Sequence, residues 1–216
     1  MITDLDLIRA SCDTYDPTVR WDQSWVRDDI HVALRHSGDS DIIAFRGSVD
    51  EADWIADMQG WPSKHPQLGY CHSGFLTGME DVYSELAMAV SPDRPFAITG
   101  HSLGAARALI LAGLFAVRGP KPLMVVTFGT PRPGMAKLSN ILNTGGFFIK
   151  HFKNGPDPVA EVPLTLAPLW LYQKPQPDTP LSVAPADDAD DPFHWHHAPL
   201  YLEGIKRLQP IIPESS

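Results

Sequence analysis

The sequence lacks the features that mark several classes of protein. It has two cysteines in 216 residues, and because a chain of this length builds a core without disulfides, we expect Cys12 and Cys71 to be free thiols. The longest apolar stretch, 108–117, is too short to cross a bilayer, which takes about 20 residues. Basic residues are scarce, 17 against 26 acidic ones, for a net charge of −9. This deficit disfavours a nucleic-acid partner, since phosphates would be repelled.

The sequence also shows no repeats and no metal-ligand spacing, so we expect no metal and no cofactor. An apolar share of 44% and a charged share of 20% are ordinary for a globular protein. We predict one domain over residues 1–216, and nothing indicates its oligomeric state. Met1–Asp6 begins acidic, without a basic start and an apolar run. The expected location is therefore the cytoplasm, with a secreted form left open.

Apolar strand patterns alternate with helical ones along most of the chain. Residues 30–34 and 41–45 predict a hairpin around Ser37–Ser40, with the second strand central because it is apolar on both faces. The segment 21–26 is too mixed to assign. Such alternation predicts an α/β fold: a mostly parallel central sheet with helices on both faces. Helices are expected at 4–11, 72–88, 103–117 and 199–208, and further strands at 96–99, 123–128 and 147–152.

Three segments stand apart from this alternation. Residues 50–67 carry an apolar stripe (Trp54, Ile55, Met58, Trp61), which predicts a lid, and Trp61 is its best candidate for facing solvent or substrate. Residues 175–192 are rich in proline and aspartate and predict an irregular acidic loop. An apolar rim that could line an acyl pocket comprises Leu164, Leu166, Leu169, Trp170, Leu171 and Tyr172.

The most informative stretch is Gly100-His101-Ser102-Leu103-Gly104, between a predicted strand and a predicted helix. A serine on so tight a turn needs glycine on both sides, because side chains at 100 and 104 would collide with the neighbouring strand and helix. Free N–H groups at the start of the helix favour negative charge near the serine. The pattern indicates a nucleophile elbow with Ser102 as the nucleophile.

A serine nucleophile needs a base, an acid that orients the base, and donors for the oxyanion. Asp157 follows the strand 147–152 between two prolines and is the candidate acid. The candidate bases are the late histidines, His194, His196 and His197. His101 is excluded as the base, because its position beside Ser102 points its side chain away. The main-chain N–H groups of Leu103 and Ser48 are the candidate oxyanion donors.

Six motifs in order make the chain similar to the class 3 lipases, the family of fungal triacylglycerol lipases. They are FRGS (45–48), DWIAD (53–57), HSGF (72–75), GHSLG (100–104), FGTPRPG (128–134) and DPVAEVP (157–163). The resemblance covers about 42–201 and implies an α/β-hydrolase fold. It implies Ser102 as nucleophile, Asp157 as acid, and Ser48 and Leu103 as oxyanion donors. It also implies His196 as the base, five positions before Tyr201, with His197 as the alternative.

We therefore expect a serine ester hydrolase that cleaves acylglycerols or shorter acyl esters through an acyl-serine intermediate. Its partner would be a small-molecule or lipid ester, with transient contact to a lipid interface. The alternatives are another acyl hydrolase, such as a feruloyl esterase or a thioesterase, and a non-catalytic binding module on the same scaffold.

Overall fold

The computed structural model describes residues 1–48, 61–163, 171–184, 191 and 193–209. Its strands are β1 (Gln23–Arg27), β2 (Ile30–Ser37), β3 (Ser40–Phe45), β4 (Pro62–His65), β5 (Gly69–His72), β6 (Phe96–His101), β7 (Met124–Phe128), β8 (Phe148–Asn154) and β9 (Asp178–Leu181). Its α-helices are α1 (Asp4–Asp13), α3 (Ser73–Leu76), α4 (Met79–Ala89), α5 (Leu103–Arg118), α6 (Ala136–Thr144) and α7 (Ala198–Leu208). Two 3₁₀ turns, η1 (Val159–Glu161) and η2 (His194–His196), complete the assignment.

Within the described residues, seven strands form a sheet in the order β1-β2-β3-β6-β7-β8-β9. The β1–β2 and β2–β3 pairs are antiparallel, and every pair from β3 to β9 is parallel. The predicted hairpin, the central position of β3 and the mostly parallel sheet are thereby confirmed. Because β3, β6, β7 and β8 run parallel, their carboxyl ends lie at one edge of the sheet, where ligands bind in open α/β sheets.

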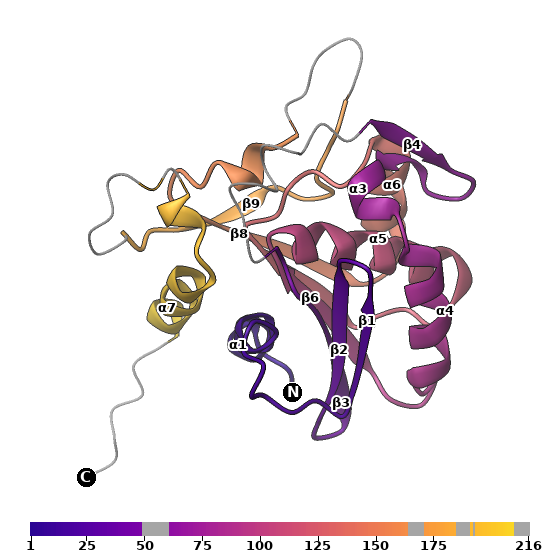
Figure 1. The fold of residues 1–216 in the computed structure, drawn as a ribbon, viewed down its shortest axis with the longest axis horizontal. Helices are drawn as coiled ribbons and strands as arrows, with labels where there is room; N and C mark the ends of the chain where they lie inside the picture. The colour runs from indigo at the N-terminus through magenta and orange to yellow at the C-terminus, as the bar shows by residue number, and fades with distance from the viewer. Residues whose placement is uncertain (49–60, 164–170, 185–190, 192, 210–216) are drawn as a thin grey trace.

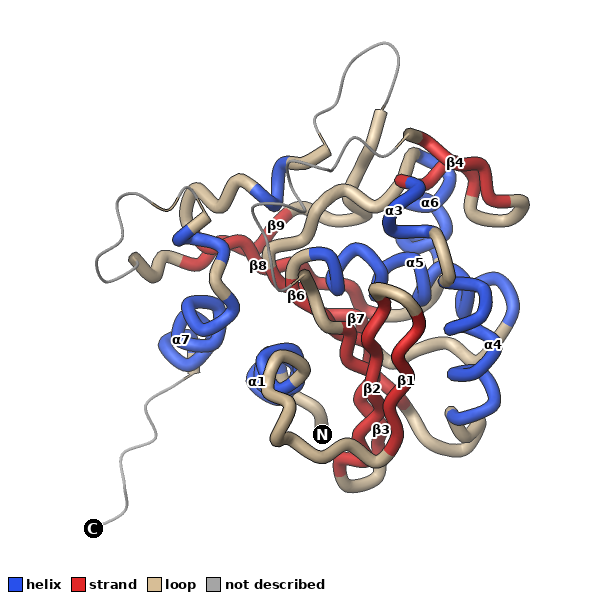
Figure 2. The backbone as a smooth tube through the Cα atoms, in the orientation of Figure 1, coloured by secondary structure: helices blue, strands red, loops and turns tan. Residues whose placement is uncertain are grey.

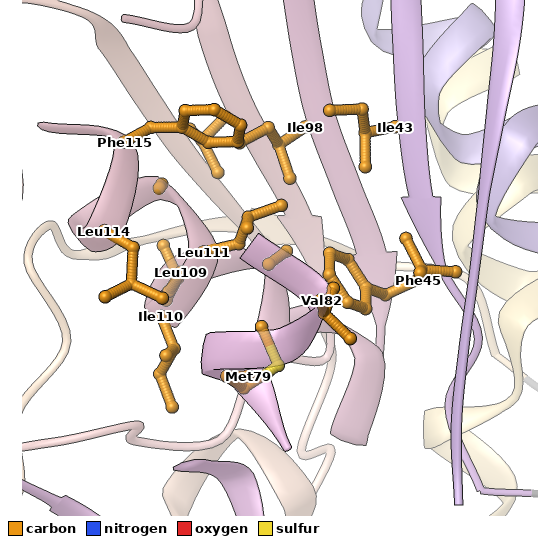
Figure 3. Packing of buried hydrophobic residues seen from close by; sticks show 14 of the residues in the cluster. Ile43, Phe45, Met79, Val82, Ile98, Leu109, Ile110, Leu111, Leu114 and Phe115 are labelled. Carbon is orange, nitrogen blue, oxygen red and sulfur yellow. The ribbon is translucent and has the colours of Figure 1, made fainter. Parts of the chain in front are cut away.

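Helices cover both faces of the sheet, as predicted (Figures 1 and 2). On one face α5 packs against β3 and β6, with α3, α4 and α6 beside it. Figure 3 shows part of this layer, with Ile43 and Ile98 of the sheet and Leu111 and Phe115 of α5 in one hydrophobic cluster. On the other face α1 and α7 cover the sheet. Each large side chain buried in these layers stabilises the fold by about 1.5–3 kcal/mol.

The predicted helix 72–88 is wrong as a single element, since α3 and α4 are separate helices. Gly78, between them, has a φ of 78°. A Cβ built on Gly78 would lie 2.7 Å from Cδ1 of Ile30. The left-handed backbone turns the chain away at a point where β2 packs closely, and apolar periodicity does not report such a turn.

The acidic segment 175–192 is not irregular throughout, because it contains β9, the last strand of the sheet. Pro180 lies in this strand opposite Lys153. Proline is tolerated there because an edge strand leaves one row of N–H groups without a strand partner. Residues 185–190 and 192 of the segment lie outside the described residues.

Most of the predicted lid also lies outside the described residues, including Trp54, Ile55 and Met58. Its last part forms β4, which pairs antiparallel with β5. Trp61, just before β4, is 68% exposed, in line with its prediction as an outward-facing aromatic. Of the predicted apolar rim, residues 164–170 lie outside the described ranges, Leu171 is exposed and Tyr172 is buried.

Candidate active site

Ser102 occupies the tight turn between β6 and α5. Its φ is 59°, a left-handed conformation that costs a residue other than glycine about 1–3 kcal/mol. A Cβ on Gly100 would collide with the backbone of Gly104 at the start of α5. A Cβ on Gly104 would lie 2.5 Å from the carbonyl oxygen of Phe45 at the end of β3. Both glycines of the elbow are therefore required for the reasons that the sequence indicated.

The turn after β3 lies directly against this elbow. A Cβ on Gly47 would lie 2.7 Å from the carbonyl oxygen of His101 and 3.0 Å from Cβ of Ser102. Only glycine fits at this approach. Ser48 is the residue that follows Gly47 in the turn after β3, and Leu103 is the first residue of α5.

Asp157 lies in the loop after β8, and three groups donate hydrogen bonds to its carboxylate. His196 Nδ1 lies 2.7 Å from Asp157 Oδ2, and the main-chain N–H of Val159 donates to Oδ1 over 2.8 Å. The hydroxyl of Tyr201, from α7, donates to Oδ2 as well. The side chains of Asp157, His196 and Tyr201 are completely buried. A buried carboxylate with this many donors is held in place and in its charged form.

The pKa of Asp157 reflects two opposed effects. Burial acts to raise it, but the charge of His196 and the donated hydrogen bonds outweigh burial and lower the pKa below its ordinary value. The same carboxylate, after burial, raises the pKa of Tyr201 well above the usual range. Asp157 is thus an anion beside His196, and an anion there stabilises the imidazolium that forms when His196 takes a proton.

The other histidines near the site have different partners. His197 is half exposed, and its Nε2 lies 3.0 Å from Asp191 Oδ2 at the surface. His101 is fully buried, and its Nε2 lies 2.6 Å from the carbonyl oxygen of His196. This position agrees with the exclusion of His101 as the base, since its ring nitrogens are bonded away from Ser102.

The hydrogen-bonded side chains of His196 and Asp157 both lie next to the end of β7. A Cβ on Gly129, the residue after β7, would lie 2.7 Å from His196 Nδ1 and 3.0 Å from Asp157 Oδ2. Ser102 is bonded to the same strand end, through its main-chain N–H to the carbonyl of Phe128 over 3.1 Å. Within the described ranges, no hydrogen bond joins Ser102 Oγ to His196.

Sequence reasoning missed two polar side chains that hold these loops, the buried Asn154 and the partly buried Tyr15. Asn154, at the end of β8, donates to the carbonyls of Val183 and Trp195 and accepts from the N–H of Val183, which fixes the chain next to His196. Tyr15, after α1, lies 3.0 Å from His101 Nδ1. A polar residue between a strand and a turn was a signal for Asn154, whereas nothing in the sequence places Tyr15 near position 101.

Among the residues that the structure describes, no group of three or more His, Cys, Asp or Glu side chains is arranged to hold a metal ion. None of the helices in the same ranges combines the length and the hydropathy that a membrane-spanning segment requires.

Comparison with known proteins gives relatives among fungal lipases. The chain is 29% identical over 167 residues to a secreted mono- and diacylglycerol lipase from Fusarium solani, covering 73% of this chain and 48% of the relative. It is 33% identical over 146 residues to a lipase from Rhizomucor miehei, covering 61% and 40%. The chain thus spans about half the length of the curated relatives it matches.

The cytoplasmic location expected from the N-terminus is wrong, because the Fusarium solani relative is named as a secreted lipase. The acidic residues that suggested it have a structural cause. Asp6 accepts from the main-chain N–H of Thr3, and the Thr3 hydroxyl accepts from the N–H of Asp6, a capping box at the start of α1. Acidic residues favour a helix start for that reason, and their presence there does not indicate the cellular location of the protein.

The fold comparison agrees with the sequence comparison. A triacylglycerol lipase whose catalytic centre is described as a serine protease triad superposes with a TM-score of 0.68 at 25% identity, covering 82% of this chain and 77% of that one. The fold is therefore that of the α/β-hydrolases, as predicted. Residues 42–167, more than half of the chain, match the model of the family described as lipase (class 3). With an elbow serine, a buried histidine–aspartate pair and these relatives, the chain belongs to the class 3 lipase family.

Proposed function

We propose that the chain is a serine hydrolase of carboxylic esters, with Ser102 as nucleophile, His196 as base and Asp157 as the acid that orients His196. Support comes above all from one contact, the buried hydrogen bond of 2.7 Å between His196 Nδ1 and Asp157 Oδ2. It fixes the imidazole tautomer, so that Nε2 is the nitrogen available for proton transfer. His197 is the weaker candidate, because its acidic partner, Asp191, lies at the surface.

In this reaction Ser102 Oγ attacks the ester carbonyl carbon while His196 Nε2 takes the hydroxyl proton. The negative charge that forms on the carbonyl oxygen is stabilised by the main-chain N–H groups of Ser48 and Leu103. His196 then returns the proton to the departing alcohol, which leaves an acyl-serine, and water releases the acid by the same steps. The Ser102–His196 hydrogen bond forms as the ester binds, since such bonds often tighten only in the enzyme–substrate complex.

For the substrate, we propose an acylglycerol or a shorter acyl ester, met at a lipid surface by a single domain over 1–216. The Fusarium solani relative is named as a mono- and diacylglycerol lipase, and the structural neighbour with the serine protease triad is named as a triacylglycerol lipase. Two exposed apolar side chains, Trp61 and Leu171, also fit a lipid surface. The carbonyl of Trp61 accepts from the main-chain N–H of Ser73, two residues after Cys71, and Leu171 lies two residues before Gln173. Gly134 forms isolated β-bridges with both Cys71 and Gln173.

The first prediction tests the nucleophile. Ser102→Ala should lower kcat by about 10⁴-fold or more, because it removes the only atom that forms the acyl intermediate. Hydrolysis is measured on a dissolved p-nitrophenyl ester and on an emulsified long-chain acylglycerol, which also compares the two substrate classes. Ser84→Ala, on the outer side of α4, is the matched control and should match the parent.

A serine-reactive phosphonate supplies the second arm. It should label Ser102 in the parent chain and leave Ser102→Ala unlabelled. If the parent hydrolyses neither ester and takes up no phosphonate, the proposal is wrong, and a non-catalytic binding module is the better description.

A further inference from the structure

A continuous row of hydrogen bonds connects the oxyanion turn to the base. The main-chain N–H of Gly47 donates to the hydroxyl oxygen of Tyr15 over 3.1 Å. That oxygen lies 3.0 Å from His101 Nδ1, and His101 Nε2 lies 2.6 Å from the carbonyl oxygen of His196. Four separate segments are joined in this way: the turn after β3, the loop after α1, the end of β6, and η2.

The direction of each bond follows from its chemistry. The carbonyl of His196 can only accept, so His101 carries its proton on Nε2. A neutral imidazole then has Nδ1 as an acceptor, and the Tyr15 hydroxyl donates to it while accepting from Gly47. With a neutral His101, the row therefore fits a single tautomer of its ring. Burial, followed by the proximity of His196, lowers the pKa of His101 to about 3, which agrees with a neutral ring.

A neutral His101 also matters electrostatically. The ring centroids of His101 and His196 are 4.5 Å apart, and the ring of Tyr201 packs edge-on at 5.6 Å. The titratable groups that face His101 are Asp157, His196 and His197. A cation on His101 would repel the imidazolium that forms on His196 during the reaction. Keeping His101 neutral therefore preserves the basicity of His196.

The oxyanion end of the row is equally constrained. A Cβ on Gly47 would collide with the Tyr15 hydroxyl oxygen and would also touch Cβ of Ser102 at 3.0 Å. The peptide that precedes Ser48 is thus pressed between Tyr15 and the nucleophile. A shift of the Tyr15 hydroxyl at one end would move Ser48, and a shift of His101 at the other would move His196.

We propose that Tyr15 and His101 are positioning residues that hold the oxyanion donor Ser48 and the base His196 in register around Ser102. This inference rests on the proposed function. We call this row of hydrogen-bonded residues, Gly47, Tyr15, His101 and His196, the relay. Neither Tyr15 nor His101 touches the ester. Errors of about 1 Å in such placement cost up to about 100-fold in rate, so loss of the relay should appear in kcat.

Two substitutions of His101 separate the two halves of the relay. Asn places an oxygen near the position of Nδ1, so His101→Asn keeps the acceptor for Tyr15 and loses the donor to His196. Gln places its amide nitrogen near the position of Nε2, so His101→Gln keeps the donor to His196 and loses the acceptor. Tyr15→Phe removes the hydroxyl alone. Tyr83→Phe, whose ring packs on Phe115 away from the site, is the control.

We expect Tyr15→Phe and His101→Asn each to lower kcat on a dissolved ester by about 10-fold or more, with KM changed less than about 3-fold. His101→Gln should fall between His101→Asn and the parent, because it retains the donor to His196. The double variant of Tyr15→Phe with His101→Asn should lose little more than the worse single one, since both act in one row. Rates equal to the Tyr83→Phe control, or strictly multiplicative losses, would overturn the inference.

A readout without catalysis keeps the two proposals apart. In ¹⁵N spectra of imidazole nitrogens, His101 of the parent should be neutral with its proton on Nε2 at pH 5, and Tyr15→Phe should alter its signals. A His101 that titrates near pH 6.5 overturns the relay even in an active enzyme. An inactive parent with the expected His101 signals overturns the proposed function while the relay stands.

Discussion

At the residue scale, Asp157 shows how a buried carboxylate remains charged. Its three donors come from parts of the chain that are distant in sequence or fixed by a turn: His196, Tyr201 and the N–H of Val159. The Tyr201 hydroxyl also accepts from the main-chain N–H of Asn154 over 3.2 Å. Tyr201 therefore connects α7 to both the end of β8 and the acid loop.

Removal of that hydroxyl should be costly. In Tyr201→Phe, Asp157 loses one donor and the N–H of Asn154 loses its acceptor, so the free energy of unfolding at pH 7 should fall by about 1–3 kcal/mol. Ester hydrolysis should survive at a reduced rate, because His196 keeps its bond to Asp157. Urea denaturation and kcat/KM measure the two effects. Tyr83→Phe serves as the control, and equal stability of the two variants would show that the Tyr201 hydroxyl contributes nothing.

At the scale of elements, the break between α3 and α4 lies where the helical layer packs against β2 of the sheet. Gly78 takes a φ of 78° at the place where Ile30 of β2 packs against it. Gly38, in the turn between β2 and β3, has a φ of 55° and nothing within 4 Å of a built Cβ. The two glycines share the left-handed backbone and differ in their surroundings.

This difference makes a matched pair of variants. Gly38→Ala should cost only the left-handed strain, about 1–2 kcal/mol of unfolding free energy. Gly78→Ala should cost about 1–3 kcal/mol more, because its Cβ would also press on Ile30. Both are measured by urea denaturation of the otherwise unchanged chain. Equal losses would mean that β2 yields to the added methyl and that strain alone matters.

At the scale of the whole molecule, two buried histidines couple the fold to pH. Burial is the main reason that the pKa values of His101 and His151 are lowered to about 3. The hydroxyl of Thr127 lies 2.7 Å from His151 Nδ1, and Thr130 donates to that hydroxyl. Between pH 6.5 and about 3 the unfolded chain binds protons at both histidines that the folded chain does not bind.

Stability should consequently be highest above pH 6.5 and should fall as the pH is lowered toward 3. Each histidine contributes a slope of about 1 kcal/mol per pH unit between pH 6 and pH 5. His151→Asn, whose oxygen can replace Nδ1 as the acceptor for Thr127, should reduce the slope by that amount. Urea denaturation at pH 7, 6 and 5 measures it, with Tyr83→Phe, which removes no group that titrates between pH 5 and pH 7, as the control. An unchanged slope in His151→Asn would contradict the role of His151.

Features that depend on local chemistry could be predicted from the order of the residues alone. The requirement for glycine at positions 100 and 104 could be predicted, because Ser102 needs a tight left-handed turn. The parallel sheet could be predicted because strands that are apolar on both faces alternate with helices. The same local rules failed at the break at Gly78 and at β9, since a close neighbour and an edge position decide those elements. The roles of Ser102, Asp157 and His196 remain predictions that the proposed assays test.

Which polar side chains come into contact depends on how distant segments of the chain pack together. Residues 101, 102 and 103 are neighbours in sequence, but Asp157, His196 and Tyr201 come together because β6, β7 and β8 end at one edge of the sheet and α7 packs back on it. Tyr15 reaches His101 for the same reason, since α1 lies across that face. The contact of Cys12 with the carbonyl of Ala198, 186 positions further along the chain, likewise follows from packing and leaves no trace in local sequence pattern.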